Sequence, residues 1–413
     1  MNGKLLSLMM TTIMIASALA GCAGDDVDLD GEDGGYEYAS NVDNHRMLMG
    51  DVCDIKDLSG AYDWDEVSDI YENGKYAEKS DGSYRTLEGF ASASGKNHAY
   101  DTYYGSDGSW DTFVSAAISG TGPFAGESNT VRDQAVEKGI QNGVMTAYAI
   151  HELNAAIIKA EAGNWGADDA QHAWDEGWAF YHGPDDSDHD FDGCGPYATA
   201  DKRAGNFGTA NSAGTAATNV ATLAAMNAGL TAMQNEDMQG LVDARDEVLK
   251  NIIIVYSQAS VRYASKMTDD LADGDTDDYD KHQAEGHAFY RVIEAYVAEH
   301  TSVCYNMVSH AITADNTQAA CEGYAYYNAS EDNNQMNYTG CYNIVTHATT
   351  EDDKTTCEAY GWVANYYSDK IVALFDLAND GDASADYEAD VRSWLQPAWD
   401  HYGIVASDIG TLQ

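Results

Sequence analysis

The sequence is poor in proline and in basic side chains. It has 4 prolines in 413 residues, and 21 Lys and Arg stand against 69 Asp and Glu, for a formal net charge of −48. Nucleic-acid binding needs a basic surface, so this charge excludes a nucleic-acid partner. The charge is typical of a soluble surface adapted to salty water, and a cation-collecting surface is the alternative. The scarcity of proline favours helices.

The common catalytic motifs are also missing. His151-Glu152 begins like a zinc-protease motif, but Ala155 stands where the second histidine is required. No GxSxG element and no phosphate-binding loop occurs. The sequence therefore predicts a protein that is not an enzyme.

The N-terminus reads as a targeting segment. An apolar stretch follows Lys4 and ends in Leu19-Ala20-Gly21-Cys22, which resembles a bacterial lipoprotein lipobox. We expect a signal peptide at residues 1–21, a lipid on Cys22 and an acidic flexible tether at 22–44. These features predict export to the cell envelope and a lipid anchor in the outer membrane or facing the periplasm. A plain secretory signal is the alternative.

Six further cysteines would lie in an oxidising compartment. A duplication narrows their fifteen possible pairings. Cys304-Tyr305-Asn306 recurs as Cys341-Tyr342-Asn343, and Cys321-Glu322 recurs as Cys357-Glu358. If each copy closes its own loop, the pairs are Cys304–Cys321 and Cys341–Cys357, which leaves Cys53–Cys194. A metal cluster of Cys and His is the alternative, although the spacing differs from that of zinc sites.

Periodic apolar positions predict a mainly α fold. The expected helices lie at 133–162, 167–182, 219–233, 241–267, 279–299 and 361–377. Glu176-Gly177-Trp178-Ala179-Phe180-Tyr181 recurs 109 positions later as Glu285-Gly286-His287-Ala288-Phe289-Tyr290. This repeat predicts a helical-bundle body at 45–413 built from two similar halves, with long loops and a duplicated Cys-containing segment at 304–357.

The repeated motif also suggests a metal site. His172, Asp175 and Glu176 fall on one stripe of a helix, and imidazole with carboxylate suits iron, zinc or manganese. Glu285 falls on an otherwise apolar stripe, so it is expected to point inward. A solvated polar face for the first stripe, and a core carboxylate paired with Arg for Glu285, are the simpler alternatives.

Three basic residues and one tyrosine complete the candidate set. Tyr263 lies on the longest expected helix, and a phenolate oxygen favours ferric iron, although core packing explains most tyrosines. Lys202 and Arg203 form a compact basic spot beside Asp201, and Arg262 adjoins Tyr263. These cations are candidates for binding a small anion. Arg203 is equally a candidate buried partner of Glu176 or Glu285.

Several segments together resemble the algal low-iron-inducible periplasmic iron-assimilation proteins and the related diatom phytotransferrins. The segments are Ala173 to Tyr181, Ala200-Asp201-Lys202-Arg203 with Asn206-Phe207, Gln258 with Val261-Arg262-Tyr263, and Ala284-Glu285-Gly286 with Ala288-Phe289. The resemblance spans roughly Tyr62 to Leu412. Ala204 and Ala210 stand where the family pattern has cysteines, which indicates a missing disulfide.

The resemblance implies iron acquisition at the cell surface, with ferric iron (Fe3+) bound beside carbonate or a similar anion, and an uptake partner at the cell envelope. Combined with the motifs above, it gives an expected metal site of Glu176, Glu285, Asp175, Tyr263 and His172, and an expected anion site of Lys202, Arg203 and Arg262. An imelysin-like metal-dependent hydrolase and a surface binding module without metal are the alternatives.

The first prediction concerns the anchor. Cys22→Ser removes the thiol that would carry lipid, so we expect the variant protein to leave the membrane fraction. Fractionation of cells that express the parent and the variant measures this. Unchanged membrane association of the variant would refute the lipoprotein interpretation.

Overall fold

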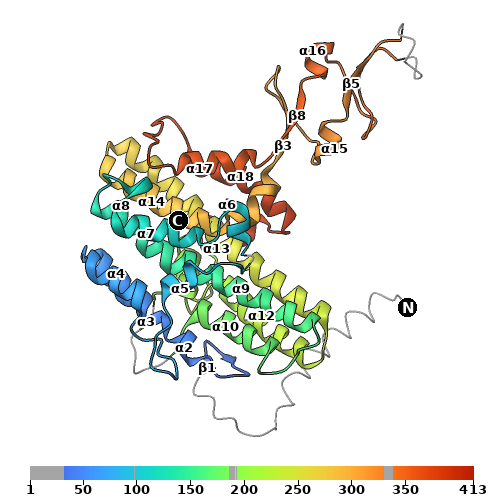
Figure 1. The fold of residues 1–413 in the computed structure, drawn as a ribbon. Helices are drawn as coiled ribbons and strands as arrows, with labels where there is room; N and C mark the ends of the chain where they lie inside the picture. The colour runs from blue at the N-terminus through green and yellow to red at the C-terminus, as the bar shows by residue number, and fades with distance from the viewer. Residues whose placement is uncertain (1–31, 97, 186–190, 192, 330–337) are drawn as a thin grey trace. The chain divides into compact units, whose positions relative to one another are not determined.

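The computed structural model describes residues 32–96, 98–185, 191, 193–329 and 338–413, and these are mainly helical (Figure 1). The mainly α expectation is therefore confirmed. The signal peptide and Cys22 lie outside the described residues. None of the helices in the described part of the chain combines the length and apolarity needed to cross a bilayer.

The helices are α2 (Asp43–Arg46), α3 (Leu48–Gly60), α4 (Trp64–Asn73), α5 (Leu87–Ala91), α6 (Ala99–Tyr104), α7 (Ser109–Ser119), η1 (Gly122–Phe124), α8 (Asn129–Lys138), η2 (Gly139–Val144), α9 (Met145–Glu161), α10 (Ala170–His182), α11 (Pro196–Phe207), α12 (Ala217–Gln234), α13 (Met238–Asp273), α14 (Thr276–Val297), η3 (Ala298–Thr301), α15 (Gln318–Cys321), α16 (Lys354–Cys357), α17 (Tyr366–Leu374), α18 (Tyr387–His401) and α19 (Ala406–Ile409). The strands are β1 (Glu32–Asp33), β2 (Tyr36–Glu37), β3 (Val303–Asn306), β4 (Ile312–Thr313), β5 (Tyr324–Tyr327), β6 (Gly340–Asn343), β7 (Thr349–Thr350) and β8 (Tyr360–Val363).

The long helix α13 forms the centre of the body. It packs against α9, α12, α14 and α18, while α9 packs against α10 (Figure 1). The Asp237 side chain caps the start of α13 by accepting a hydrogen bond from the Gly240 amide. The helix ends at Gly274, whose left-handed φ of 74° favours glycine. Two of the helices that touch α13 or α9, namely α10 and α14, carry the repeated motif.

Two expected helices differ from the structure. The helix predicted at 133–162 is interrupted by the π-helical turn η2. In this turn Gly143 lies directly against the ring of Trp110, where a side chain would clash. The helix predicted at 361–377 begins only at Tyr366, because Tyr360–Val363 form strand β8.

Residues 32–44, assigned to the tether from the sequence, belong to the body. Asp33 is fully buried and forms an ion pair with Arg46, with 2.6 Å between Oδ2 and Nε. Tyr38 donates a hydrogen bond to the same carboxylate at 2.6 Å. The acidic composition suggested disorder, but a paired carboxylate and buried rings stabilise this segment.

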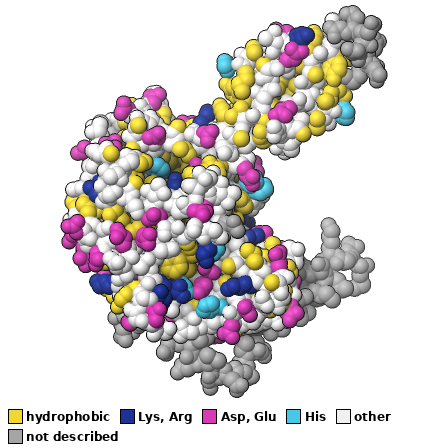
Figure 2. Space-filling view, viewed as in Figure 1, with side chains coloured by type: hydrophobic (Ala, Val, Ile, Leu, Met, Phe, Trp, Pro, Cys, Tyr) yellow, Lys and Arg dark blue, Asp and Glu magenta, His cyan; other side chains and the backbone are white. Residues whose placement is uncertain are grey.

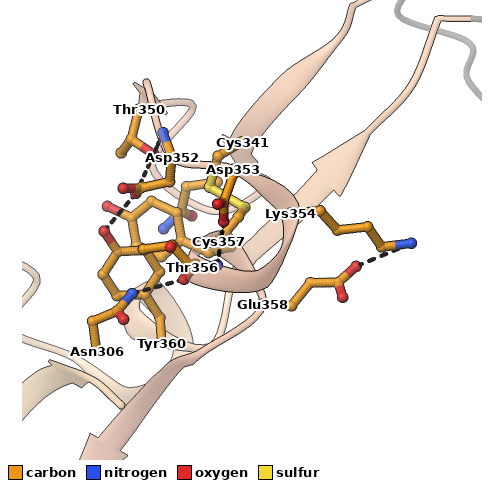
Figure 3. Close-up of a disulfide and its surroundings, with 12 residues drawn as sticks. Asn306, Cys341, Thr350, Asp352, Asp353, Lys354, Thr356, Cys357, Glu358 and Tyr360 are labelled. Atoms are coloured by element: carbon orange, nitrogen blue, oxygen red, sulfur yellow. Dashed lines mark hydrogen bonds and ion pairs between the residues drawn. A yellow bond between two sulfur atoms is a disulfide. The ribbon is translucent and has the colours of Figure 1, made fainter. Parts of the chain in front are cut away.

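All three predicted disulfides are present. Cys53–Cys194 joins α3 to the residues before α11. Cys304–Cys321 closes the first copy of the duplicated segment, and Cys341–Cys357 closes the second (Figure 3). The two copies also exchange strands. The last strand of the second copy, β8, pairs with β3 of the first, while β5 of the first copy pairs with β6 of the second. Each copy therefore completes the sheet of the other.

Acidic side chains are spread over the face seen in Figure 2, with Lys and Arg scattered among them. The acidic side chains do not gather into one patch on that face. This distribution agrees with a charge that serves solubility.

The two motif glycines each permit a close helix contact. A Cβ on Gly177 would lie 2.8 Å from Leu153 of α9, and a Cβ on Gly286 would overlap the ring of Phe375. Gly205 of α11 is a useful contrast, because a Cβ there would meet nothing within 4 Å.

The second prediction uses this contrast. Gly286→Ala should lower the free energy of unfolding by about 1–3 kcal/mol, because the added methyl overpacks the contact with Phe375. Gly205→Ala, the matched control, should raise it by about 0.5–1 kcal/mol through helix propensity. Urea unfolding followed by circular dichroism measures both, and equal effects of the two substitutions would contradict the close contact.

Candidate metal centre and its surroundings

Glu176 of α10 lies between two imidazole rings. Its Oε1 is 3.2 Å from Nδ1 of His45 on α2 and 3.2 Å from Nε2 of His172, one turn earlier on α10. His45 is buried, with 4% of its surface exposed, and the Glu176 side chain is 12% exposed. The three side chains therefore bring two nitrogen donors and one carboxylate together at the edge of the core.

A second carboxyl group adjoins Glu176. Glu152 of α9 is hydrogen-bonded to it. The pKa of Glu152 is raised, mainly by burial and to a smaller extent by repulsion from Glu176. Burial raises the pKa of Glu176 too, but the hydrogen bond from His172 and the electrostatic interaction with the two imidazoles lower it more. Without a cation, one proton is held between the two carboxyl groups.

The imidazoles differ in protonation. Burial lowers the pKa of His45 to about 4, so its ring is neutral at pH 7. The hydrogen bond to Glu176 raises the pKa of His172. A neutral imidazole is the form that binds a metal ion.

Asp175 supports this group from behind. It is fully buried and accepts hydrogen bonds from Tyr36 Oη at 2.7 Å, and from the Ser40 amide and hydroxyl at 2.8 Å each. The Ser40 hydroxyl is also 2.8 Å from Nδ1 of His172. Asp175 was expected to be a metal ligand, but both of its oxygens are occupied by donors, so it positions His172 through Ser40.

A small cavity lies beside His151 of α9, and none of Glu152, Glu176, His45 and His172 lines it. It has a volume of about 100 Å³ and is lined in part by Lys96, His98 and His151. The His98 and His151 rings are stacked with centroids 4.4 Å apart, and His151 Nε2 is 4.0 Å from Glu152. These rings form one wall near the two carboxyl groups.

The spacing of these donors bears on metal binding. Ligand atoms that lie about 2.1 Å from one metal ion are about 3.0–3.4 Å from one another. The two contacts of Glu176 with imidazole nitrogens, at 3.2 Å, lie in this range. Among the described residues, however, no set of three or more His, Cys, Asp or Glu side chains is already arranged as a metal site. Metal binding here would require side-chain rotation.

Glu285 occupies different surroundings. No hydrogen bond or ion pair joins it to Glu176 in the described part of the chain, and it instead forms a hydrogen bond with Tyr263 of α13. Burial raises the pKa of Glu285 and raises that of Tyr263 to about 12. The two repeated glutamates thus belong to two separate clusters, where the sequence analysis had placed them in one site.

Two of the expected anion-binding residues lie around Tyr263. The guanidinium carbons of Arg203 and Arg262 are 5.5 and 5.8 Å from its ring centre. Arg203 is 8% exposed, and its Nε and Nη1 have no hydrogen-bond partner, like Nε of Arg262. Arg203 makes no ion pair with Glu176 or Glu285, which leaves the anion alternative open. Lys202 is exposed and points to the Gly193 carbonyl, 3.4 Å away, outside this cluster.

The comparison with protein families identifies the family of this chain. A family described as low iron-inducible periplasmic protein matches residues 9–296, a range that includes both glutamate clusters. The chain belongs to this family. No curated protein and no solved structure matches it. The low iron-inducible periplasmic family implies export, which agrees with the expected localisation.

Sequence reasoning missed two members of the Glu176 group. His45 was treated as the first residue of the body, and Glu152 was noted only beside His151 in a failed protease motif. Both lie far from Glu176 along the chain, and neither is part of the repeat. Only the packing of α2 and α9 against α10 brings them to it.

The third prediction concerns the two carboxyl groups in metal-free protein. The folded chain holds a proton near Glu152 that the unfolded chain releases at lower pH, so Glu152 contributes stability that declines as pH rises from about 5 to about 8. Glu152→Gln removes this titrating group. Relative to the parent, the change in the free energy of unfolding between pH 5 and pH 8 should therefore differ by roughly 1–2 kcal/mol, in the direction of a smaller loss.

Urea unfolding in a chelator at pH 5 and pH 8 measures this difference. Glu299→Gln is the control, because the Glu299 side chain is 78% exposed. The same pH dependence in the parent and in Glu152→Gln would contradict the shared proton.

Proposed function

We propose that this protein is a lipid-anchored iron-binding protein of the cell envelope that serves iron acquisition. Iron is its cargo, and Glu176, His45 and His172 are its proposed ligands, with Glu152 as a fourth. The observation that carries the proposal is the contact of Glu176 with two imidazoles at 3.2 Å beside a second buried carboxyl group. Membership of a family named for induction by low iron supports the choice of metal.

The chemistry of the group suits iron. Imidazole nitrogen together with carboxylate oxygen binds iron, zinc and manganese better than it binds calcium or magnesium. Two buried carboxyl groups that share a proton release it when a cation arrives, because the cation removes their repulsion. Ferric iron, the harder ion, gains most from the second carboxylate, so we propose that the bound state is ferric.

The cluster around Tyr263 is the proposed anion site. Arg203 is buried with two unpaired nitrogens, and a buried guanidinium without partners is costly. Carbonate or a similar small anion would satisfy these donors. Since Glu285 and Tyr263 do not contact Glu176, the anion would act on iron binding from a separate cluster. Glu285 and Tyr263 would then support the anion instead of ligating iron.

The fourth prediction tests the metal ligands. Glu176→Gln and His45→Gln should each weaken iron binding at least tenfold, because each removes one proposed ligand from a buried site. Glu294→Gln is the matched control, since Glu294 is also a buried glutamate on a motif helix but contacts the Tyr103 and Tyr104 hydroxyls. Calorimetry with ferric nitrilotriacetate and metal analysis by mass spectrometry measure binding, and circular dichroism checks folding.

The same titration separates the two clusters. Arg203→Gln should remove the dependence of iron binding on bicarbonate and leave the bicarbonate-free affinity unchanged. If Glu176→Gln and His45→Gln both bind iron like the parent, the metal centre lies elsewhere. If the parent itself takes up no iron, a surface binding module becomes the better interpretation.

A further inference from the structure

A second cavity lies between α7 and α14, outside both glutamate clusters. Its volume is about 540 Å³, within the range of small-molecule sites. Both helices pack against α8 (Figure 1). The α7 side provides hydroxyl groups and the apolar surface of Phe113 and Ala116, and the α14 side provides His287 and Arg291. The hydroxyl groups are those of Ser109, Thr112, Ser115, Ser119 and Thr121.

Three buried polar atoms of this lining have no hydrogen-bond partner. They are Ser109 Oγ, His287 Nδ1 and Arg291 Nε, and Ser109 is only 4% exposed. Buried polar atoms are nearly always paired. These three atoms are themselves shielded from solvent, so a ligand in the cavity would reach them after rotation of their side chains.

The charge in this cavity comes from Arg291. Its guanidinium lies 3.9 Å from the ring centre of Tyr104 and donates through Nη2 to the Ser109 carbonyl at 3.1 Å. It makes no ion pair within the described residues, because the nearby Glu294 accepts from the hydroxyls of Tyr103 and Tyr104. Burial and the neighbouring Arg291 lower the pKa of His287 to about 4, so the imidazole is neutral. Arg291 is therefore the charged side chain of the cavity lining, and Glu294 outside the lining interacts with it electrostatically.

Two of the lining residues belong to the second copy of the repeated motif. His287 and Arg291 lie 109 positions after Trp178 and His182, so they occupy the corresponding places in that copy. The Trp178 indole is fully buried, donates to the Asp33 carbonyl at 3.0 Å and stacks on His182. In the second copy the smaller imidazole of His287 has a buried and unpaired Nδ1. The two copies therefore have different polar surroundings at these positions, and His182 lines a separate cavity of about 220 Å³.

We propose that this cavity binds a small organic carboxylate with an apolar body. The carboxylate would accept from Arg291 and Ser109, and the apolar part would lie against Phe113 and Ala116. A guanidinium favours planar carboxylates, which it binds through two parallel hydrogen bonds. The volume and the apolar wall favour an organic molecule over a small inorganic anion. The proposal does not depend on iron, since Glu176 and His45 do not line the cavity.

The fifth prediction uses benzoate as the probe and benzamide as its neutral isostere. Calorimetry on the full chain should show benzoate binding at least tenfold tighter than benzamide. Arg291→Gln should abolish this preference, because it removes the positive charge. Arg392→Gln is the matched control, since Arg392 also lies over an aromatic ring, that of Phe207, and contacts a backbone carbonyl, but does not line the cavity.

A second variant guards against misfolding. Ala116→Phe fills the cavity and keeps Arg291 and His287, so it should weaken benzoate binding at least tenfold with an unchanged thermal midpoint. Equal affinity for benzoate and benzamide, or parent-like benzoate binding by both Arg291→Gln and Ala116→Phe, would overturn the proposal. Glu176→Gln should bind benzoate like the parent, which separates failure of this site from failure of the iron site.

Discussion

The need to bury carboxylates in a chain with few cations shapes this structure. With 69 acidic and only 21 basic side chains, most buried carboxylates must find neutral donors. Tyrosine supplies many of them. Tyrosine hydroxyls contact the carboxyl groups of Asp33, Asp175, Glu285 and Glu294 in four separate places. A phenol hydroxyl donates to a carboxylate without adding charge, so these contacts hold the helices together where ion pairs are scarce.

Glu176 and Glu152 depart from this pattern. Among the described residues no tyrosine or arginine is hydrogen-bonded or ion-paired with them, and their neighbours are the imidazoles of His45 and His172 and each other. Asp175, by contrast, has hydrogen-bond donors for both of its oxygens. A cation beside Glu176 would relieve the repulsion between the two carboxyl groups. Metal binding and folding stability are expected to be linked there.

The duplicated motif shows how one helical element takes on different surroundings. In both copies the glycine allows a close contact and the aromatic pair that follows is buried. The first copy surrounds its glutamate with histidines, and the second surrounds its glutamate with a phenol next to arginines. At the position of Trp178 the second copy has His287, which lines a cavity. The repeat preserves packing, while the polar chemistry around it differs.

The sequence by itself determined the elements that depend on local or paired patterns. Apolar periodicity predicted the long helices from α8 to α10 and from α12 to α14, because one face of each must be buried, but it missed α3, α11 and α18. The duplication predicted all three disulfides. The π-helical turn at Gly143 and strand β8 were missed because contacts with distant residues decide them. The order of residues 32–44 was missed for the same reason. This acidic segment would be disordered alone, but its ion pair with Arg46 and its contacts with the core stabilise it.

The candidate site was predicted in part. The stripe of His172, Asp175 and Glu176 follows from helix geometry, which the sequence contains. The tertiary structure decided that His45 and Glu152 join Glu176, that Asp175 is already bonded, and that Glu285 belongs to another cluster. Side chains on different helices meet only through packing angles and loop paths, and no spacing along the chain encodes these directly.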